Sequence, residues 1–247
     1  SDLCPEEALI RRVRREVFAD DRALKLIKAR GINANWDMVY LAFSYQLVRA
    51  LAALYPLRPK QVESWLNGSL NREALQEIGD ALPGDFALDY AAFVDDFGKS
   101  EVVKHEMLLY LNQLVKEKTG IETRSFSRNS PLWDLCQETF QEWYLGDALV
   151  KESIGREAYQ KGKRGFLNDE IPIVPPEKMS ALLAGLKKKG LVLGIGTGRP
   201  QIETVEPLKA LGLLQHYDAN RVVSASTVLQ AEKTDPSRAP LAKPHPY

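Results

Sequence analysis

Residues 191–200 read LVLGIGTGRP, and this stretch constrains the fold more than any other part of the chain. A short aliphatic run ends abruptly at Thr197, which lies between two glycines, and helical patterns precede and follow the run. This arrangement predicts a buried strand over residues 191–196 whose carboxyl end lies at a sheet edge, where open α/β folds bind ligands. The Thr197 hydroxyl and the amides of Thr197 and Gly198 are suited to an anion there, most naturally a phosphate.

The composition is that of a globular protein without a strongly charged surface. Of 247 residues, 45% are hydrophobic, and 33 basic side chains balance 33 acidic ones. This balance argues against nucleic acid or an anionic membrane as the main partner, and no apolar run approaches the ~18 residues of a membrane span. The first residues have no basic start or apolar run, so we expect no signal peptide. Cys4 and Cys136 lack metal-site spacing, and we expect a cytoplasmic protein with free thiols rather than a disulfide.

Residues 1 to about 165 predict helices almost throughout, because apolar residues recur at helical spacing between glycine and proline breaks. The segment after Asn35 is apolar on most sides, which indicates the central helix of a bundle. The expected helices cover residues 5–30, 35–51, 60–66, 72–81, 101–118 and 131–144.

Two charged groups in this helical part allow a functional and a structural interpretation. A basic cluster near residue 12 fits a solvated helix face better than a patch for phosphate or RNA. Three carboxylates near residue 95 allow a metal site, but their positions near helix ends favour a structural role. The residues are Arg11, Arg12, Arg14 and Arg15 in the first group, and Asp89, Asp95 and Asp96 in the second.

The pattern changes near residue 169. A helix is expected over 176–189, the strand over 191–196, a helix over 201–211 with a bend at Pro207, and a second strand over 221–224. Alternation of this kind predicts a parallel-sheet α/β fold, so the chain divides into a helical domain, residues 1–168, and an α/β domain, residues 169–247.

A lysine on a proline-flanked turn follows the second predicted strand. Lys243 begins the sequence KPHP and supplies a positive charge at the sheet edge that carries the Thr197 hydroxyl. A hydroxyl and an ammonium group on neighbouring strands are suited to a phosphoryl group. The GIGTG run is not a dinucleotide fingerprint, because Arg199 stands where a third glycine is required.

Residues 169–247 resemble the haloacid dehalogenase-like (HAD) hydrolase superfamily, especially its phosphoglycolate-phosphatase-like branch. Four features carry the resemblance in the same order as in that branch: the helix from Pro176, the LGIGTGRP run, the PLKALGL continuation after Glu206, and the KPHP motif. The resemblance implies part of a Rossmann-like parallel-sheet HAD core, preceded by a large all-α cap domain.

The resemblance also implies roles for individual residues. Thr197 would bind the transferred phosphoryl group with Gly198, and Lys243 would neutralise its charge. Arg199 would either point into the same cleft or remain in solvent. The implied activity is that of a phosphatase, the Mg²⁺-dependent hydrolysis of a small phosphorylated metabolite through an aspartyl-phosphate, with a helical cap that selects the substrate.

The chain departs from the superfamily pattern in two places. No Asp-x-Asp motif follows an N-terminal strand, since Asp95 and Asp96 are adjacent, and the acidic motif that holds magnesium would come after Tyr247. We therefore predict no metal ligand within this chain and no hydrolysis by this chain alone. Either the missing parts lie in flanking sequence, which we favour, or they lie on another chain, or the protein is a non-catalytic HAD-like binding or interaction protein. A phosphomutase or dehalogenase reaction is a further alternative.

Overall fold

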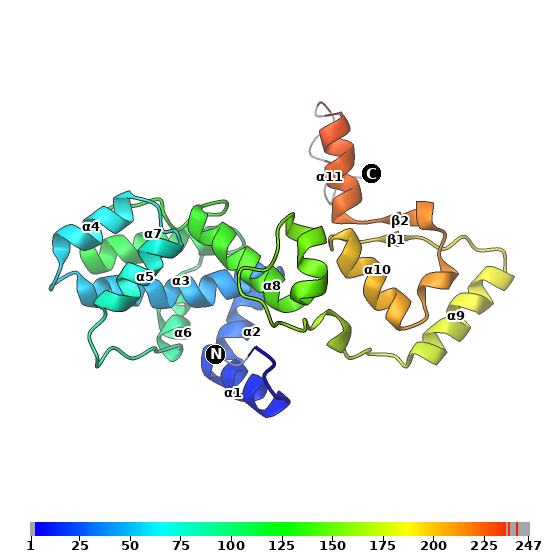
Figure 1. Ribbon diagram of the computed structural model, residues 1–247, viewed down its shortest axis with the longest axis horizontal. Helices are drawn as coiled ribbons and strands as arrows, with labels where there is room; N and C mark the ends of the chain where they lie inside the picture. The colour runs from blue at the N-terminus through cyan, green and yellow to red at the C-terminus, as the bar shows by residue number, and fades with distance from the viewer. Residues whose placement is uncertain (1–2, 236, 238–240, 242–247) are drawn as a thin grey trace. The chain divides into compact units, whose positions relative to one another are not determined.

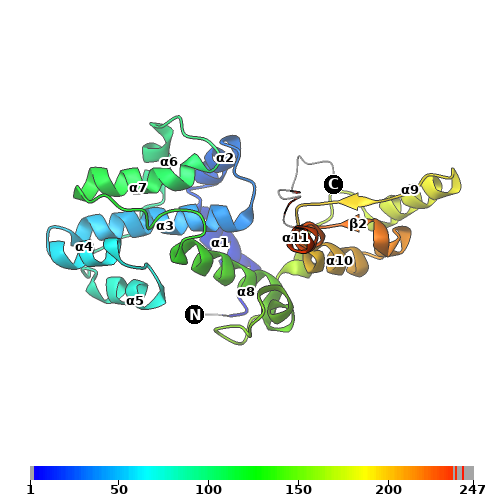
Figure 2. The ribbon, with the colours of Figure 1, turned by 90° about the horizontal axis from the view of Figure 1, so that it is seen from above.

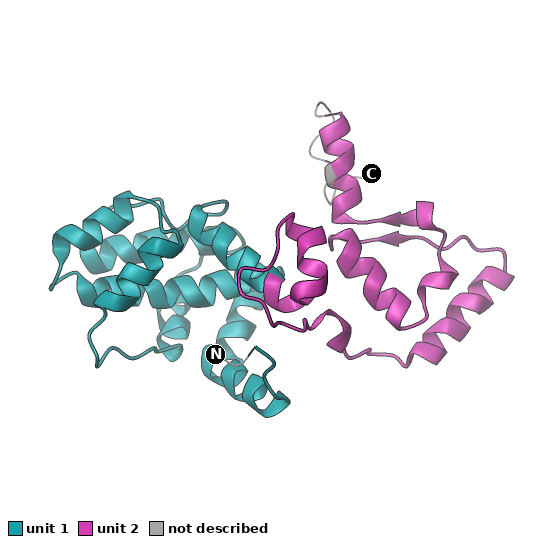
Figure 3. Ribbon diagram, viewed as in Figure 1, with its two compact units in different colours: residues 1–141 teal, residues 142–247 magenta. Residues whose placement is uncertain are grey.

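The computed structural model describes residues 3–235, 237 and 241, and most of them are helical (Figure 1). The chain divides into two compact units, residues 1–141 and 142–247 (Figure 3). The first contains α1 (Glu7–Val17), α2 (Arg22–Ala29), α3 (Asn35–Leu54), α4 (Pro59–Asn67), α5 (Arg72–Ala81), α6 (Ala91–Gly98) and α7 (Glu106–Thr119). Helix α8 (Pro131–Ile154) spans the division. The second unit continues with η1 (Leu167–Asp169), α9 (Pro176–Lys188), β1 (Ile195–Gly196), α10 (Gln201–Ala210), η2 (Leu214–His216), η3 (Ala219–Arg221), β2 (Val222–Val223) and α11 (Ala225–Thr234).

Helix α3 is the centre of the first unit, as its apolar sequence predicted. It is buried on most of its sides and packs along α7, with α4 and α5 also against it (Figure 2). Aromatic rings fill the neighbouring core: Phe93 stacks on Phe97 with 4.3 Å between ring centroids, and Tyr45 meets Phe93 edge-on at 5.4 Å. Burial of such rings contributes much of the stability of a helical core.

Local signals place most helix ends in this unit where the sequence predicts them. Pro59 occupies the first turn of α4, and the Asn71 side chain caps α5 by accepting a hydrogen bond from the Ala74 amide at 3.0 Å. Gly120 ends α7 in the left-handed conformation, with φ 75°.

The single helix expected over residues 5–30 is wrong. Three successive residues, Ala19, Asp20 and Asp21, have φ of 47°, 56° and 64°, which breaks the segment into α1 and α2. A left-handed conformation cannot continue a right-handed helix. The Arg14 guanidinium reaches across this break to Asp21 at 3.1 Å.

In the second unit, helix α8 is interrupted at Gly146, which has φ 71° and ψ 175°. The backbone of Gly165 lies directly against this break: a Cβ atom on Gly146 would lie 2.5 Å from the Gly165 nitrogen. The Asp147 amide donates to the Lys163 carbonyl at 3.0 Å beside this contact. Glycine at both positions therefore lets residues 163–165 cross the broken helix.

Residues 142–168 belong to the same compact unit as the C-terminal part of the chain. Leu145, Val150, Ala158 and Leu167 form a small buried cluster, against which Ile202 of α10 packs. Because these contacts tie the segment to α10, the observed division falls after residue 141, whereas the sequence pattern places it after residue 168.

Strands β1 and β2 form a parallel pair, with Ile195 opposite Val222 and Gly196 opposite Val223. Of the strand expected over residues 191–196, only the last two residues pair. The residues that precede β2 form the 3₁₀ turn η3, so no described segment pairs with residues 191–194 to continue the ladder.

This finding corrects the predicted fold class. The sequence predicted part of a Rossmann-like parallel-sheet HAD core, whereas the described residues, 62% of them helical, contain a single two-stranded parallel sheet. A strand depends on neighbours for its backbone hydrogen bonds, and β1 has only β2. The fold is therefore mostly helical. Among the helices of the described residues, none combines the length and apolar character that crossing a bilayer requires.

Candidate functional site

Thr197 directly follows β1 at its carboxyl end. Its amide donates to the Val223 carbonyl at 2.9 Å and so extends the parallel pair, which leaves that amide unavailable to a ligand. Its half-buried side-chain oxygen accepts a hydrogen bond from the Arg199 amide at 3.1 Å. The hydroxyl proton and the Gly198 amide have no acceptor among the described residues. Together they provide two hydrogen-bond donors for an anion.

The turn after β1 is fastened to the end of β2 by three hydrogen bonds. The Arg199 carbonyl accepts from the Ala225 amide at 2.9 Å, and the Gln201 amide donates to the Ser226 hydroxyl at 3.0 Å. The buried Ser224 hydroxyl donates to the Gln201 side-chain oxygen at 2.8 Å. These bonds restrain the backbone that follows Thr197, as preorganisation of a binding turn requires.

The Arg199 side chain takes part in a cluster with Glu170 and Tyr144. Its guanidinium forms an ion pair with the Glu170 carboxylate and donates to the Tyr144 hydroxyl at 2.7 Å. The Tyr144 hydroxyl in turn donates to Glu170 at 2.6 Å. The carboxylate thus compensates the positive charge of Arg199, whose assigned contribution to phosphate binding remains a prediction.

The cluster shifts the pKa of each of its members. The hydrogen bond from Arg199 holds the pKa of the Glu170 carboxyl below its usual range, and the same bond raises the pKa of Arg199. Burial, reinforced by the hydrogen bond to Glu170, raises the pKa of the Tyr144 hydroxyl. At neutral pH the cluster therefore contains a carboxylate, a guanidinium and a protonated phenol.

A hollow of about 590 Å³ lies beside β2, close to the same turn. Its lining comes from β2, the turn before it, and the N-terminal ends of α10 and α11: Gln201, Ala219, Asn220, Val222, Val223, Ser226 and Thr227. Lys243, the second predicted partner of the phosphoryl group, lies outside the described residues, and its pairing with Thr197 remains a prediction.

The carboxylates considered as metal ligands make structural contacts. The Asp89 carboxylate accepts a hydrogen bond from the Ala92 amide at 3.0 Å at the start of α6. The Asp96 carboxylate accepts a hydrogen bond from the Tyr45 hydroxyl at 2.9 Å and forms an ion pair with Lys118 at 3.3 Å. Burial alone would raise the pKa of Asp96, but the hydrogen bonds from Tyr45 and Lys118 lower it below its usual range. In the part of the chain that the structure describes, no group of three or more acidic, histidine or cysteine residues could hold a metal ion.

The cysteines do not form a disulfide. Cys4 is exposed and Cys136 is buried among the residues of the helical core, where burial raises the pKa of its thiol to about 12. In the basic cluster of α1, Arg11 pairs with Glu7 at 2.8 Å, as expected for a solvated helix face that carries both signs of charge.

Sequence reasoning missed Tyr144 and Glu170, because each lies far from Arg199 in the chain and neither belongs to a recognisable motif. The proline residues after Glu170 indicated only an extended segment. A pairing of this kind depends on how residues 142–170 pack against α10, and the sequence carries no local signal for that packing.

Comparisons with known proteins give one structural likeness. No family model matches the chain, and no curated protein matches it. A crystal structure from the Northeast Structural Genomics Consortium is similar, with 32% sequence identity, a TM-score of 0.84, and coverage of 100% of this chain. The chain spans 64% of the length of that protein, whose description names no activity or ligand. The likeness supports the fold.

Proposed function

We propose that this chain supplies the phosphoryl-binding turn of a phosphohydrolase that resembles the haloacid dehalogenase type. The observation that carries the proposal is the position of Thr197 at the carboxyl end of β1, where its hydroxyl proton and the Gly198 amide lack acceptors among the described residues. Donors held at a strand end by a fixed turn are suited to the oxygens of a phosphoryl group.

The proposed reaction of the intact protein is hydrolysis of a small phosphate ester. An aspartate carboxylate would attack phosphorus, the ester oxygen would leave, and water would then hydrolyse the aspartyl-phosphate. The described residues do not fit the magnesium ion that the resemblance implies, because no cluster of metal ligands occurs among them. The contribution proposed for this chain is therefore limited to orienting the phosphoryl oxygens through Thr197 and Gly198.

The first prediction is that the chain binds phosphate through Thr197 without hydrolysing an ester. Addition of inorganic phosphate should shift the Gly198 amide signal in ¹H–¹⁵N NMR spectra in a saturable manner. Thr197→Val should weaken this binding by roughly tenfold, since it removes a donor to a charged acceptor, and Thr197→Ser should restore it. With p-nitrophenyl phosphate, the chain alone should show no turnover.

The matched control is Thr234→Val, because the Thr234 hydroxyl is exposed at the end of α11 and bonds only its own helix, at the Gln230 carbonyl. This variant should bind phosphate like the unmodified chain. Equal binding by Thr197→Val, or a Gly198 signal that phosphate leaves unchanged, would remove the basis of the proposal. A Lys243→Ala variant tests the second predicted contact in the same titration.

A further inference from the structure

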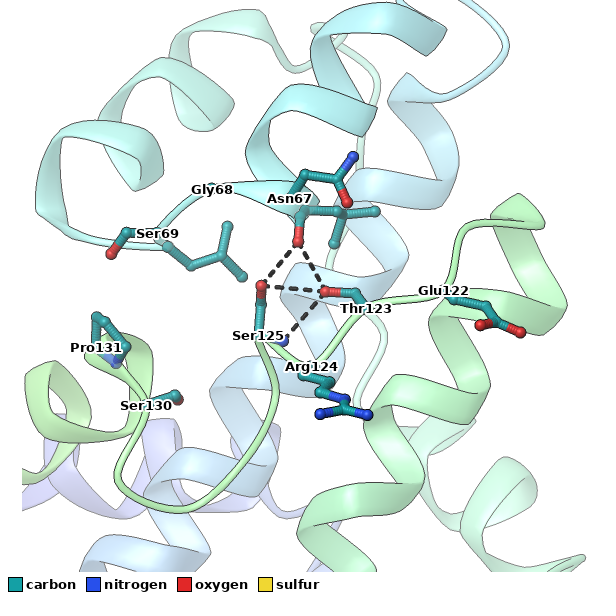
Figure 4. Close-up of a pocket in the computed structure, with 11 residues that line it drawn as sticks. Asn67, Gly68, Ser69, Glu122, Thr123, Arg124, Ser125, Ser130 and Pro131 are labelled. Atoms are coloured by element: carbon teal, nitrogen blue, oxygen red, sulfur yellow. Dashed lines mark hydrogen bonds between the residues drawn. The ribbon is translucent and has the colours of Figure 1, made fainter.

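A second pocket, of about 540 Å³, lies within the first unit (Figure 4). One wall is the turn between α4 and α5, and the other is the segment between α7 and α8. The lining residues are Leu66, Asn67, Gly68, Ser69, Leu70, Glu122, Thr123, Arg124, Ser125, Ser130 and Pro131. Its volume falls within the range of roughly 300–1,000 Å³ that is typical of small-molecule sites.

Hydrogen bonds between the two walls hold this pocket in shape. The hydroxyls of Thr123 and Ser125 both donate to the Leu66 carbonyl, at 2.8 and 2.9 Å (Figure 4). The Ser125 amide also donates to the Thr123 hydroxyl oxygen at 3.1 Å. Among the lining residues, the Leu66 and Leu70 side chains are buried. The pocket is thus formed before any ligand binds, which lowers the conformational cost of binding.

The charges around the pocket do not balance. The Glu122 carboxylate pairs with Lys116 of α7 at 2.6 Å, and the hydrogen bond from Lys116 lowers the pKa of Glu122. The exposed Arg124 guanidinium has no acidic partner and no hydrogen-bond acceptor among the described residues. A positive charge therefore remains at the pocket after the Lys116–Glu122 pair has cancelled.

Unused polar groups accompany this charge. The Ser69 hydroxyl and the Asn67 carboxamide form no hydrogen bond with any described residue, and neither does the Ser69 amide. The planar guanidinium of an arginine matches the two oxygens of a carboxylate or phosphate, while a hydroxyl and a carboxamide suit the hydroxyl groups of a ligand.

We propose that this pocket binds a small hydroxylated organic anion, a carboxylate or phosphate ester, whose charge Arg124 neutralises. The site is separate from the Thr197 turn, because every residue that lines it belongs to residues 1–141 and Thr197 belongs to the second unit. The inference therefore does not depend on the function proposed above.

The test is a set of ¹H–¹⁵N NMR titrations of the whole chain with glycerate, glycerol 3-phosphate and uncharged glycerol. We expect at least one of the anions to produce saturable shifts at the amides of Ser69, Thr123 and Ser125, and glycerol to produce none. The tighter-binding anion then identifies carboxylate or phosphate as the preferred group. No saturable shift with either anion, or equal binding of glycerol, overturns the proposal.

The variant Arg124→Gln removes the charge and keeps a polar, though shorter, side chain. It should weaken anion binding at these amides by at least about tenfold. The matched control is Arg128→Gln, since the Arg128 guanidinium lies over the Trp133 ring, 5.7 Å from its centroid, and does not line the pocket. Equal weakening by both variants, or none by Arg124→Gln, contradicts the assignment.

Two internal readouts keep the result unambiguous. Unchanged signals of Ser69 and Leu70, which line the opposite wall, in the ligand-free Arg124→Gln variant establish that the pocket has kept its shape. The Gly198 amide reports phosphate at the Thr197 turn separately in the same spectra. Shifts confined to Gly198 count against the pocket proposal and leave the proposed phosphoryl-binding turn standing.

Discussion

The two compact units differ in how much apolar surface they bury. In the first, one continuous cluster of buried side chains extends from Ala23 to Cys136. Among the described residues of the second, the buried cluster is much smaller and consists of Leu145, Val150, Ala158 and Leu167. Further apolar side chains of the second unit are buried outside this cluster, such as Leu183, Leu213 and Val222, while others are exposed, such as Ile171, Ile173 and Val192. The first unit is therefore stabilised mainly by packing, and the second depends more on particular backbone and polar contacts.

This difference shows which elements form without a large core. A helix satisfies most of its hydrogen bonds internally, so α9 forms although Leu183 is the residue it buries. A strand obtains its hydrogen bonds from neighbours, and β1 accordingly extends over two residues. Substitutions in the two units should therefore differ in their effects according to whether they remove packing or a specific contact.

The largest effect is expected from Phe97→Ala in the first unit. The Phe97 ring is fully buried, stacks on Phe93 and meets Tyr110 edge-on at 5.2 Å. Its removal leaves a cavity and should lower the free energy of unfolding by about 3–5 kcal/mol. Hydrogen exchange measured by mass spectrometry resolves the two units, and protection should fall across residues 35–119.

The corresponding apolar substitution in the second unit is Leu182→Ala. The Leu182 side chain is 56% exposed. This substitution should change stability by less than about 0.5 kcal/mol. A similar loss from both substitutions would end the distinction between a packed and a weakly packed unit. Faster exchange in both units after Phe97→Ala would show that they unfold together.

A smaller but still large effect is expected from Gly146→Ala at the break in α8. Gly146 has φ 71°, and a Cβ atom there would meet the backbone of Gly165 at 2.5 Å and of Arg164 at 2.6 Å. Strain and steric overlap together should cost about 3 kcal/mol, measured as lost exchange protection in residues 142–170. The matched control is Gly155→Ala. Gly155 also has a positive φ, 77°, but no atom lies within 4 Å of a Cβ added there. This substitution should lower the free energy of unfolding by about 1 kcal/mol. Equal costs would mean that the backbone crossing contributes nothing.

The helical part of the fold was largely predictable, because its signals are local. Helical periodicity placed α3 and α5, and Gly120 closed α7 as expected. The break between α1 and α2 was not predicted, since Ala19, Asp20 and Asp21 contain no glycine or proline to mark it. Left-handed backbone at such residues is sustained by packing around them, which single-sequence patterns do not record.

The α/β part was predicted less well, and the reason is physical. The run that ends at Thr197 carries the composition of a buried strand, but pairing requires a partner of matching length. Because η3 replaces a strand before β2, the sheet consists of two short strands. The position of Thr197 at a strand end was predicted correctly. Its contact with Arg199, and the ion pair of Arg199 with Glu170, depend on tertiary packing that the sequence does not reveal.

The last comparison lies within the second unit, between a buried ion pair and an exposed one. Glu142 is buried and contacts Lys163 at 3.1 Å and Arg156 at 2.8 Å. Burial tends to raise the pKa of Glu142, but hydrogen bonds from the Tyr159 amide, Arg156 and Lys163 lower it below its usual value of 4.5. Glu142→Gln should lower the free energy of unfolding of this unit by about 2 kcal/mol at neutral pH. Glu170→Gln should lower it by less than about 1 kcal/mol, because the Arg199–Glu170 pair is about two-fifths exposed and screened by solvent.

The pH dependence of stability separates the charge of Glu142 from its shape. Because the native pKa lies below the unfolded one, the unfolded state binds the proton more readily, and the stabilisation is complete only above the usual value of 4.5. It should be lost as the pH falls through the lowered native pKa. Urea titrations of the unmodified chain between pH 7 and pH 3, with exchange protection of residues 142–170 as the readout, should show this loss. Glu142→Gln should reduce the dependence of the free energy of unfolding on pH more than Glu170→Gln does. Equal slopes in all three proteins would mean that the buried pair stabilises the second unit through packing alone, and polar contacts would then no longer distinguish it from the first.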